Sequence, residues 1–173
     1  MGETEERLEG WFAGRVPGEW FEGAPEVSVD REEILIVGTL ADVDPGKEAT
    51  EAQRAEARAG RIKQFREDTR DQRMRIAREA EHRFRRKVSW GAECGGEREL
   101  FTTLSLPMMT RLRMPERQVL DTLVESGVAR SRSHALAWSV RLVAEKQGEW
   151  LKDLEQALEG VQKVRSAGPV TNA

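Results

Sequence analysis

The side chains best suited to chemistry are arginines and serines within residues 109–143. Apolar and basic residues alternate just before Pro115. A strand period of two would place two sets of side chains on opposite faces: Met109, Arg111 and Arg113 on one, and Thr110, Leu112 and Met114 on the other. Each guanidinium is a planar fork of N–H donors that can hold an acceptor with two hydrogen bonds. This pattern favours recognition of a polar or charged partner.

A second basic group, residues 130–133 (Arg-Ser-Arg-Ser), stands where a helix should begin. Leu136, Val140 and Val143 follow with helical spacing, and Ser131 before them is a preferred N-cap residue. The first backbone N–H groups of a helix have no partner within the helix and can bind a phosphate. Nearby arginines would add charge to such a contact.

Catalytic constellations are absent from the sequence. His82 and His134 have no cysteine or histidine partners at metal-ligand spacing. Cys94 precedes two glycines, with no helix N-terminus beside it to activate a thiol. No phosphate-binding glycine loop, nucleophile elbow or paired-carboxylate signature is visible. We therefore expect a protein that is not an enzyme and that uses no metal and no cofactor.

The composition predicts one ordinary domain or two small ones. Of the 173 residues, 34% are charged and 38% are apolar, so the core should be modest. One cysteine excludes an internal disulfide and fits a reducing compartment. No apolar run approaches the ~20 residues that span a bilayer, and the acidic residues 3–6 are the reverse of a signal peptide. We expect a cytoplasmic protein without membrane contact.

The net charge of −3 conceals segments of opposite sign. Residues 1–50 contain 13 acidic and 4 basic side chains, whereas residues 51–87 contain 7 acidic and 13 basic ones. Residues 105–148 contain 4 acidic and 7 basic side chains. The acidic and basic segments can neutralise each other within the chain, or the basic ones can meet a polyanion. Composition leaves both interpretations open.

Residues 1–46 form an acidic segment in which a short helix over residues 3–13 should precede a β-hairpin. Trp-Phe pairs stand at 11–12 and 20–21. The favoured interpretation is that these pairs anchor a core, and the alternative is an exposed patch that binds a partner. Residues 26–40 alternate or are β-branched on both sides of a polar turn, which predicts the hairpin.

Residues 47–87 predict one long charged helix that is loosened near Gly60. Its end, residues 82–87, reads His-Arg-Phe-Arg-Arg-Lys. Cations are favourable at a helix C-terminus, so a solvated face that complements the helix dipole is the simpler interpretation. A nucleic-acid contact is the alternative.

Residues 88–107 predict a second β-hairpin. Gly95-Gly96 suits a two-residue turn of type I′, and that turn would set Trp90 opposite Phe101. Residues 108–148 then combine a strand, a helix, a glycine turn and a serine-capped helix. Residues 149–173 predict an amphipathic helix with heptad-like apolar spacing, followed by a frayed tail.

Residues 109–145 resemble the ribbon-helix-helix module of the Arc and methionine repressors. The similarity rests on the alternating strand before Pro115, the turn at Gly127 and the serine-rich start of the second helix. It covers about a fifth of the chain. The resemblance implies a homodimer in which two strands pair antiparallel and enter the major groove of double-stranded DNA.

The resemblance also implies three groups of site residues. Base contacts would come from Met109, Arg111 and Arg113, and each guanidinium fork on a guanine is worth about 1–3 kcal/mol of discrimination. Phosphate contacts would come from Arg130, Ser131, Arg132 and Ser133. The dimer core would consist of Leu112, Met114, Leu120, Leu123, Leu136 and Val140.

The expected fold class is α+β, with two β-hairpins and a long basic helix preceding a C-terminal ribbon-helix-helix-like helical region. The leading hypothesis is a dimeric double-stranded DNA-binding protein that regulates transcription. The main alternative is a non-enzymatic adaptor that dimerises through the same fold and binds a protein partner through its acidic N-terminal segment. RNA or ribosome association through residues 70–87 is a third. A plain strand and helical hairpin with solvated arginines would show the same helix start and stop signals at Pro115, Gly127 and Ser131.

Overall fold

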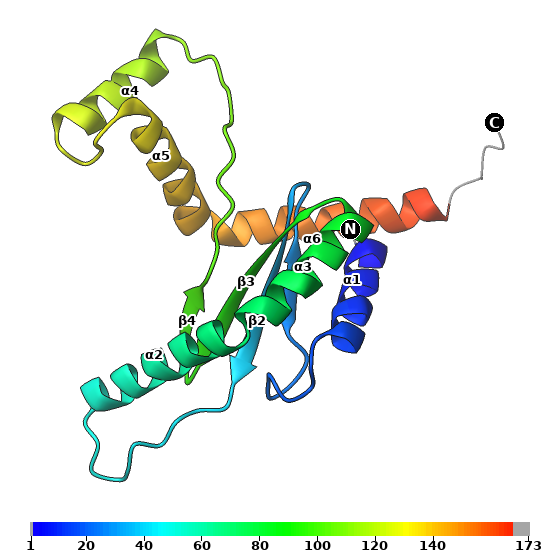
Figure 1. Ribbon diagram of the computed structural model, residues 1–173. Helices are drawn as coiled ribbons and strands as arrows, with labels where there is room; N and C mark the ends of the chain where they lie inside the picture. The colour runs from blue at the N-terminus through cyan, green and yellow to red at the C-terminus, as the bar shows by residue number, and fades with distance from the viewer. Residues whose placement is uncertain (1, 168–173) are drawn as a thin grey trace. The chain divides into compact units, whose positions relative to one another are not determined.

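The computed structural model describes residues 2–167, whose helices and sheet fall into two compact units that meet between Leu106 and Pro107 (Figure 1). Unit 1 contains α1 (Gly2–Arg15), β1 (Glu26–Val29), β2 (Glu33–Leu40), α2 (Glu51–Asp68), α3 (Arg70–Phe84), β3 (Lys87–Cys94) and β4 (Glu97–Leu100). Unit 2 contains α4 (Met114–Glu125), α5 (Arg132–Lys146) and α6 (Gly148–Ser166). The α+β class is confirmed.

Residues 168–173 of the expected C-terminal tail lie outside the described residues. None of the described helices combines the length and the apolar character that crossing a bilayer requires.

The sheet has the order β1-β2-β3-β4. β1 and β2 are antiparallel, as are β3 and β4, so both predicted hairpins are confirmed. A parallel pairing of β2 with β3, which sets Ile34 opposite Val88, joins the hairpins into one sheet. The sequence did not predict this union. Because parallel neighbours need a long crossover, the chain passes through α2 and α3 between them.

The second hairpin turns at Gly95 and Gly96, whose φ angles of 55° and 87° fit the predicted type I′ turn. The Phe101 backbone N–H donates to the Trp90 carbonyl at 2.7 Å, which confirms the predicted pairing. β4 ends at Leu100, so the strand is shorter than the sequence suggested.

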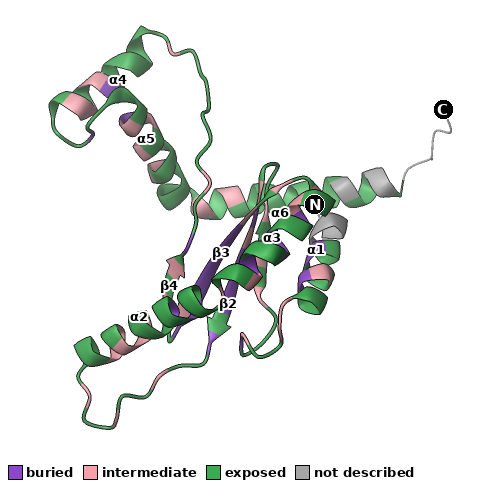
Figure 2. Ribbon diagram, viewed as in Figure 1, coloured by how far each residue is buried: buried purple, intermediate pink, exposed green. Residues whose placement is uncertain are grey.

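One apolar core joins the three helices of unit 1 to one face of the sheet (Figure 2). The Trp-Phe pairs belong to it. Phe12 is fully buried, and the Trp20 ring lies edge-on to the Phe65 ring at 5.5 Å between centroids. Trp11 lies edge-on to Phe84 at 5.6 Å. The favoured interpretation, that these pairs anchor a core, is therefore confirmed, and the alternative of an exposed aromatic patch is wrong.

The predicted long helix is broken at Thr69, between α2 and α3, and it continues undisturbed through Gly60. The Thr69 hydroxyl donates to the Phe65 carbonyl at 2.6 Å and accepts from Arg73 Nε at 2.8 Å. A threonine that bonds back to the preceding turn is known to bend helices. Arg73 is only 6% exposed, and its guanidinium also lies 4.7 Å from the Phe101 ring centroid.

Replacing Thr69 by alanine should lower the free energy of unfolding by about 1–3 kcal/mol, because it leaves a buried guanidinium N–H without its acceptor. Urea denaturation followed by tryptophan fluorescence measures this loss. Thr69→Ser retains the hydroxyl and should lose about 0.5 kcal/mol or less. Equal losses in the two variants would contradict the role given to the hydroxyl.

Acidic side chains of the first 50 residues pair with basic ones inside unit 1. Arg58 holds the Asp42 carboxylate with two hydrogen bonds of 2.9 and 3.0 Å, and these lower the pKa of Asp42 to about 2. Arg98 likewise donates two hydrogen bonds to the Glu26 carboxylate, at 3.0 and 3.2 Å. Neutralisation within the chain therefore occurs at these positions, one of the two interpretations that composition left open.

Candidate nucleic-acid interface

Residues 107–113 have no regular secondary structure and are solvent-exposed apart from the half-buried Leu112. Met109 is 98% exposed, and Arg111 and Arg113 are also exposed. The strand expected at Met109–Met114 is not present in the single chain, in which residues 102–113 have no regular structure. The physical reason is that a strand needs a neighbour for its backbone groups. Unit 2 has no other strand among its described residues that could supply one.

The helix after this segment begins at Met114 as Pro115 predicts. Arg113 precedes it with an extended backbone, φ −80° and ψ 175°. Arg117 Nη1 donates to the Leu112 carbonyl at 2.8 Å, which ties the end of the extended segment to the first turn of α4. The side chains of Arg111 and Arg113 have no hydrogen-bond or ion-pair partner among the described residues, so their guanidinium forks face solvent.

The turn between α4 and α5 follows the predicted signals. Gly127 has a φ of 79°, a left-handed conformation that glycine adopts at little cost. Ser131 is the N-cap of α5, and its Oγ accepts from the backbone N–H of His134 at 3.2 Å. Both predictions are confirmed. The N-terminus of α5 is exposed, with Arg130 and Ser133 beside the cap.

Ser131→Ala should destabilise unit 2 by about 0.5–2 kcal/mol, because an N–H group of the first turn of α5 loses its acceptor. Amide hydrogen exchange of α5, read by mass spectrometry, resolves this change within the full chain. Ser133→Ala is the matched control, since that hydroxyl makes no hydrogen bond with the described residues. Faster exchange in the control than in Ser131→Ala would rule out the cap as the cause.

Arg132 is already engaged. Its Nε and Nη2 donate to the two carboxylate oxygens of Asp121 on α4, at 2.6 and 2.7 Å. The hydrogen bonds lower the pKa of Asp121 and raise that of Arg132. This ion pair links α4 to α5, and Arg132 could contact a phosphate only if the pair with Asp121 were broken. Sequence reasoning missed Asp121, because an acid and a base eleven residues apart on different helices leave no local signal.

Unit 2 buries little apolar surface by itself (Figure 2). Its buried cluster consists of Leu120, Ala129 and Ala135. The six residues expected in the dimer core divide into three groups: Leu120 is buried, Leu112, Leu123 and Leu136 are half-buried against the cluster, and Met114 and Val140 are 61% and 64% exposed.

The predicted C-terminal helix is present as α6, and it is separated from α5 at Gln147. Large apolar side chains stay exposed along it: Trp150, Leu154, Leu158, Val161 and Val164. Their spacing of three or four residues places them on one stripe of the helix. A stripe of this kind normally packs against another apolar surface.

The surroundings of the cysteine and the grouping of possible metal ligands can be read from the described residues. Within the described residues, no three side chains of the His, Cys, Asp or Glu type gather as metal ligands would. Cys94 is buried, and its burial, followed by the nearby Asp42 carboxylate, raises the pKa of the thiol. The thiol is therefore kept protonated at neutral pH, the opposite of an activated nucleophile.

The comparisons with known proteins divide the chain as the structure does. Residues 6–100 match the family model described as the N-terminal domain of Rv1265-like protein. Residues 113–165 match the one described as the Mb1296 C-terminal domain. Arg113 falls inside the second match, and Arg111 lies between the two matches.

The chain is similar to two mycobacterial proteins that carry the name uncharacterized protein, Mb1296 of Mycobacterium bovis and Rv1265 of Mycobacterium tuberculosis. Each is 57% identical over 159 residues, which cover 92% of this chain and 69% of the relative. No solved structure matches the chain.

Proposed function

The chain belongs to the Rv1265-like family, and we propose that it is a homodimeric protein that binds double-stranded DNA. In this proposal, residues 109–113 of two copies pair as an antiparallel ribbon that enters the major groove. Arg111 and Arg113 read base edges, with Met109 beside them. The exposed start of α5 contacts the phosphate backbone.

The observation that carries the proposal is the state of residues 107–113. They lack regular structure and are exposed directly before α4, the backbone of Arg113 is extended, and Arg111 and Arg113 have no side-chain partner among the described residues. An unpaired extended segment is a ready template for pairing with another chain. Pairing of two copies would satisfy the backbone groups and align four arginines on one face of the ribbon.

The shortage of core in unit 2 supports a dimer. Below roughly 40 residues, and often above, small domains need an added source of stability such as oligomerisation. The described part of unit 2 is longer than that, yet the buried residues of its apolar cluster are Leu120, Ala129 and Ala135. A second copy would cover Met114 and Val140, at about 25 cal/mol for each Å² of apolar surface removed from water.

In this proposal, the four side chains at the start of α5 contribute differently to the phosphate contact. Arg130 is exposed and its side chain is not engaged by the described residues, so it is free to meet a phosphate. Ser131 already caps α5 with its side chain, so its own contribution would be to keep the helix start in place. Ser133 is exposed in the first turn. Arg132 contributes only where the phosphate competes with Asp121.

The alternative of an adaptor that binds a protein through residues 1–50 has less support. Its two motivations were the Trp-Phe pairs and the acidic surplus. Phe12 is buried in the core, and Asp42 is neutralised by Arg58. The hypothesis of RNA or ribosome association through α3 is supported only by the basic character of that helix.

Selection from a random duplex library tests the proposal. The full chain should enrich a defined site, and binding to that site should weaken linearly in a plot of log affinity against log salt, with a slope of about −0.9 for each phosphate neutralised. Failure to enrich any sequence, together with passage through a heparin column at low salt, would exclude DNA binding. Enrichment of structured RNA over duplex DNA would favour the third hypothesis.

A further inference from the structure

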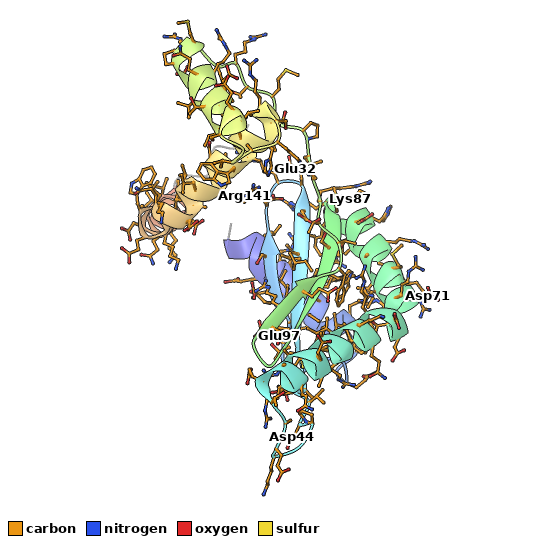
Figure 3. The ribbon with its side chains drawn as sticks, turned by 90° about the vertical axis from the view of Figure 1, so that its left-hand side faces the viewer. Glu32, Asp44, Asp71, Lys87, Glu97 and Arg141 are labelled. Carbon is orange, nitrogen blue, oxygen red and sulfur yellow. The ribbon has the colours of Figure 1, made fainter. Side chains whose placement is uncertain are left out.

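A strongly basic pocket of about 570 Å³ lies in unit 1, at the end of the sheet where the β1–β2 turn meets the start of β3. Figure 3 shows Glu32 and Lys87 together at this end. Its permanent cations come from three places, the β1–β2 turn, α3 and the α3–β3 junction: Arg31, Arg78, Arg85, Arg86 and Lys87. His82 and the carboxylates of Glu32 and Glu81 complete its polar wall, and Leu104 and Leu106 add an apolar wall.

The backbone that forms this pocket is strained at one position. Arg85 follows α3 with φ 57° and ψ 35°, and it is the one residue other than glycine with a positive φ in the described chain. A left-handed conformation costs a residue with a Cβ roughly 1 kcal/mol, and glycine is the usual occupant of such a helix end. An arginine at this position suggests that its side chain has a use that offsets the strain.

One of the two carboxylates in the pocket, that of Glu81, is already paired. The Glu81 carboxylate accepts from Lys87 Nζ at 3.2 Å and from the Val88 backbone N–H at 3.3 Å. Arg86 is held differently, since its Nε donates to the backbone carbonyl of Asp30 at 2.7 Å. After two backbone hydrogen bonds, the charge of Arg86 also helps to lower the pKa of the Asp30 carboxyl.

Three guanidinium groups in the pocket have no hydrogen-bond or ion-pair partner among the described residues: Arg31, Arg78 and Arg85. The dipole of α3 favours cations at its C-terminus, with an effective charge of about −0.5. That half-charge cannot balance the surplus of cations over the two carboxylates. It also does not explain Arg31, which comes from the β1–β2 turn. Like charges on the wall of one pocket repel one another, and a bound anion would relieve that repulsion.

We propose that this pocket binds an oligophosphate anion, either a free polyphosphate or the phosphate chain of a nucleotide. Planar guanidinium forks match phosphate oxygens and bind them with paired hydrogen bonds. Arginines from separate segments of the chain line this one pocket, whose volume is in the range usual for small-ligand sites. The proposal concerns unit 1 alone and does not depend on DNA binding by unit 2.

Isothermal titration of the full chain with sodium tripolyphosphate, at 150 mM salt (about physiological ionic strength), tests the site. The wild type should show saturable binding. Arg85→Gly should bind at least about tenfold more weakly, since a hydrogen bond to a charged group is worth about 1.5–3 kcal/mol. The same substitution relieves the left-handed backbone, so its thermal stability should equal or exceed that of the wild type. Loss of binding therefore cannot be attributed to unfolding.

Two further variants separate pocket chemistry from total charge. Arg78→Ala removes one cation of the pocket from α3 and should also weaken binding about tenfold. Lys63→Ala removes one exposed cation of α2 that does not line the pocket, and it should leave affinity within about twofold. Equal effects of Arg78→Ala and Lys63→Ala would overturn the proposal, as would saturable binding that Arg85→Gly leaves unchanged.

The choice of ligand distinguishes the sources of the phosphate. Tighter binding of a nucleoside triphosphate than of tripolyphosphate indicates a nucleotide, and equal affinity indicates the phosphate chain alone; both outcomes support the site. Absence of binding by either ligand overturns it. If the pocket substitutions weaken only duplex DNA, the surface belongs to nucleic acid and the oligophosphate proposal is wrong. The titration is repeated with the variant Arg111→Ala/Arg113→Ala. Because the pocket lies in unit 1, this variant should bind the ligand as the wild type does even if it no longer binds DNA.

Discussion

Replacing Arg111 and Arg113 together by alanine is expected to reduce affinity for a selected duplex at least about a thousandfold. In a dimeric ribbon the double substitution removes four guanidinium forks, each worth about 1–3 kcal/mol at a base edge, and about 4 kcal/mol is already a thousandfold. Both side chains are exposed and have no partner among the described residues, so the fold should be unchanged. A gel-shift titration with the selected duplex and with a scrambled one measures the effect.

The matched control removes the same charge from unit 2 at another position. Arg141 and Lys146 are exposed on α5, away from the extended segment in sequence. Their joint replacement by alanine should weaken specific and scrambled duplexes about equally and modestly, as lost long-range attraction does. If this control weakens the selected duplex as much as the arginine pair does, Arg111 and Arg113 do not read bases.

Phe12→Ala is expected to lower the stability of unit 1 by about 3–5 kcal/mol, because it leaves a cavity in a core that has little surplus. Phe12 is fully buried, with the Trp11 ring 4.8 Å and the Trp90 ring 6.3 Å away between centroids. Hydrogen exchange of β2 and β3 amides reports the loss for unit 1 without interference from unit 2.

Glu9→Ala provides the control on the same helix. Glu9 is exposed, and alanine is a good helix former, so exchange of the sheet should change by no more than about 0.5 kcal/mol. A small effect of Phe12→Ala, comparable with this control, would mean that α1 contributes little to the core.

Local features were predictable where a few neighbouring residues decide the structure. Gly95-Gly96 specified both the turn type and the pairing of Trp90 with Phe101, because a two-residue turn leaves a single register. Ser131 specified the start of α5 for a similar reason, since only one backbone N–H of the next turn is within its reach.

Features that depend on distant contacts were not predictable. The parallel pairing of β2 and β3 joins segments separated by two helices, and no local pattern encodes it. The break at Thr69 depends on the buried Arg73, whereas the more conspicuous Gly60 stays helical because the tertiary structure overrides its weak propensity.

The candidate site also contains features that the sequence predicts and features that depend on distant contacts. Its exposed arginines and its capped helix follow from residue types and spacing. The pairing of Arg132 with Asp121 and the left-handed backbone of Arg85 could be seen only in the folded chain. The strand at residues 109–113 is a third case, because its neighbour would belong to another copy, and a single chain cannot supply it.

Distance measurement between spin labels tests the pairing of two extended segments most directly. A label on Met109→Cys, in a chain carrying Cys94→Ala, should give a distance of about 15–25 Å between copies, since each residue of a strand advances about 3.3 Å. Leu112→Asp in the same labelled chain should abolish that distance by placing a charge in the dimer core. A labelled protein without any such distance, or with one beyond about 40 Å, would contradict the antiparallel ribbon.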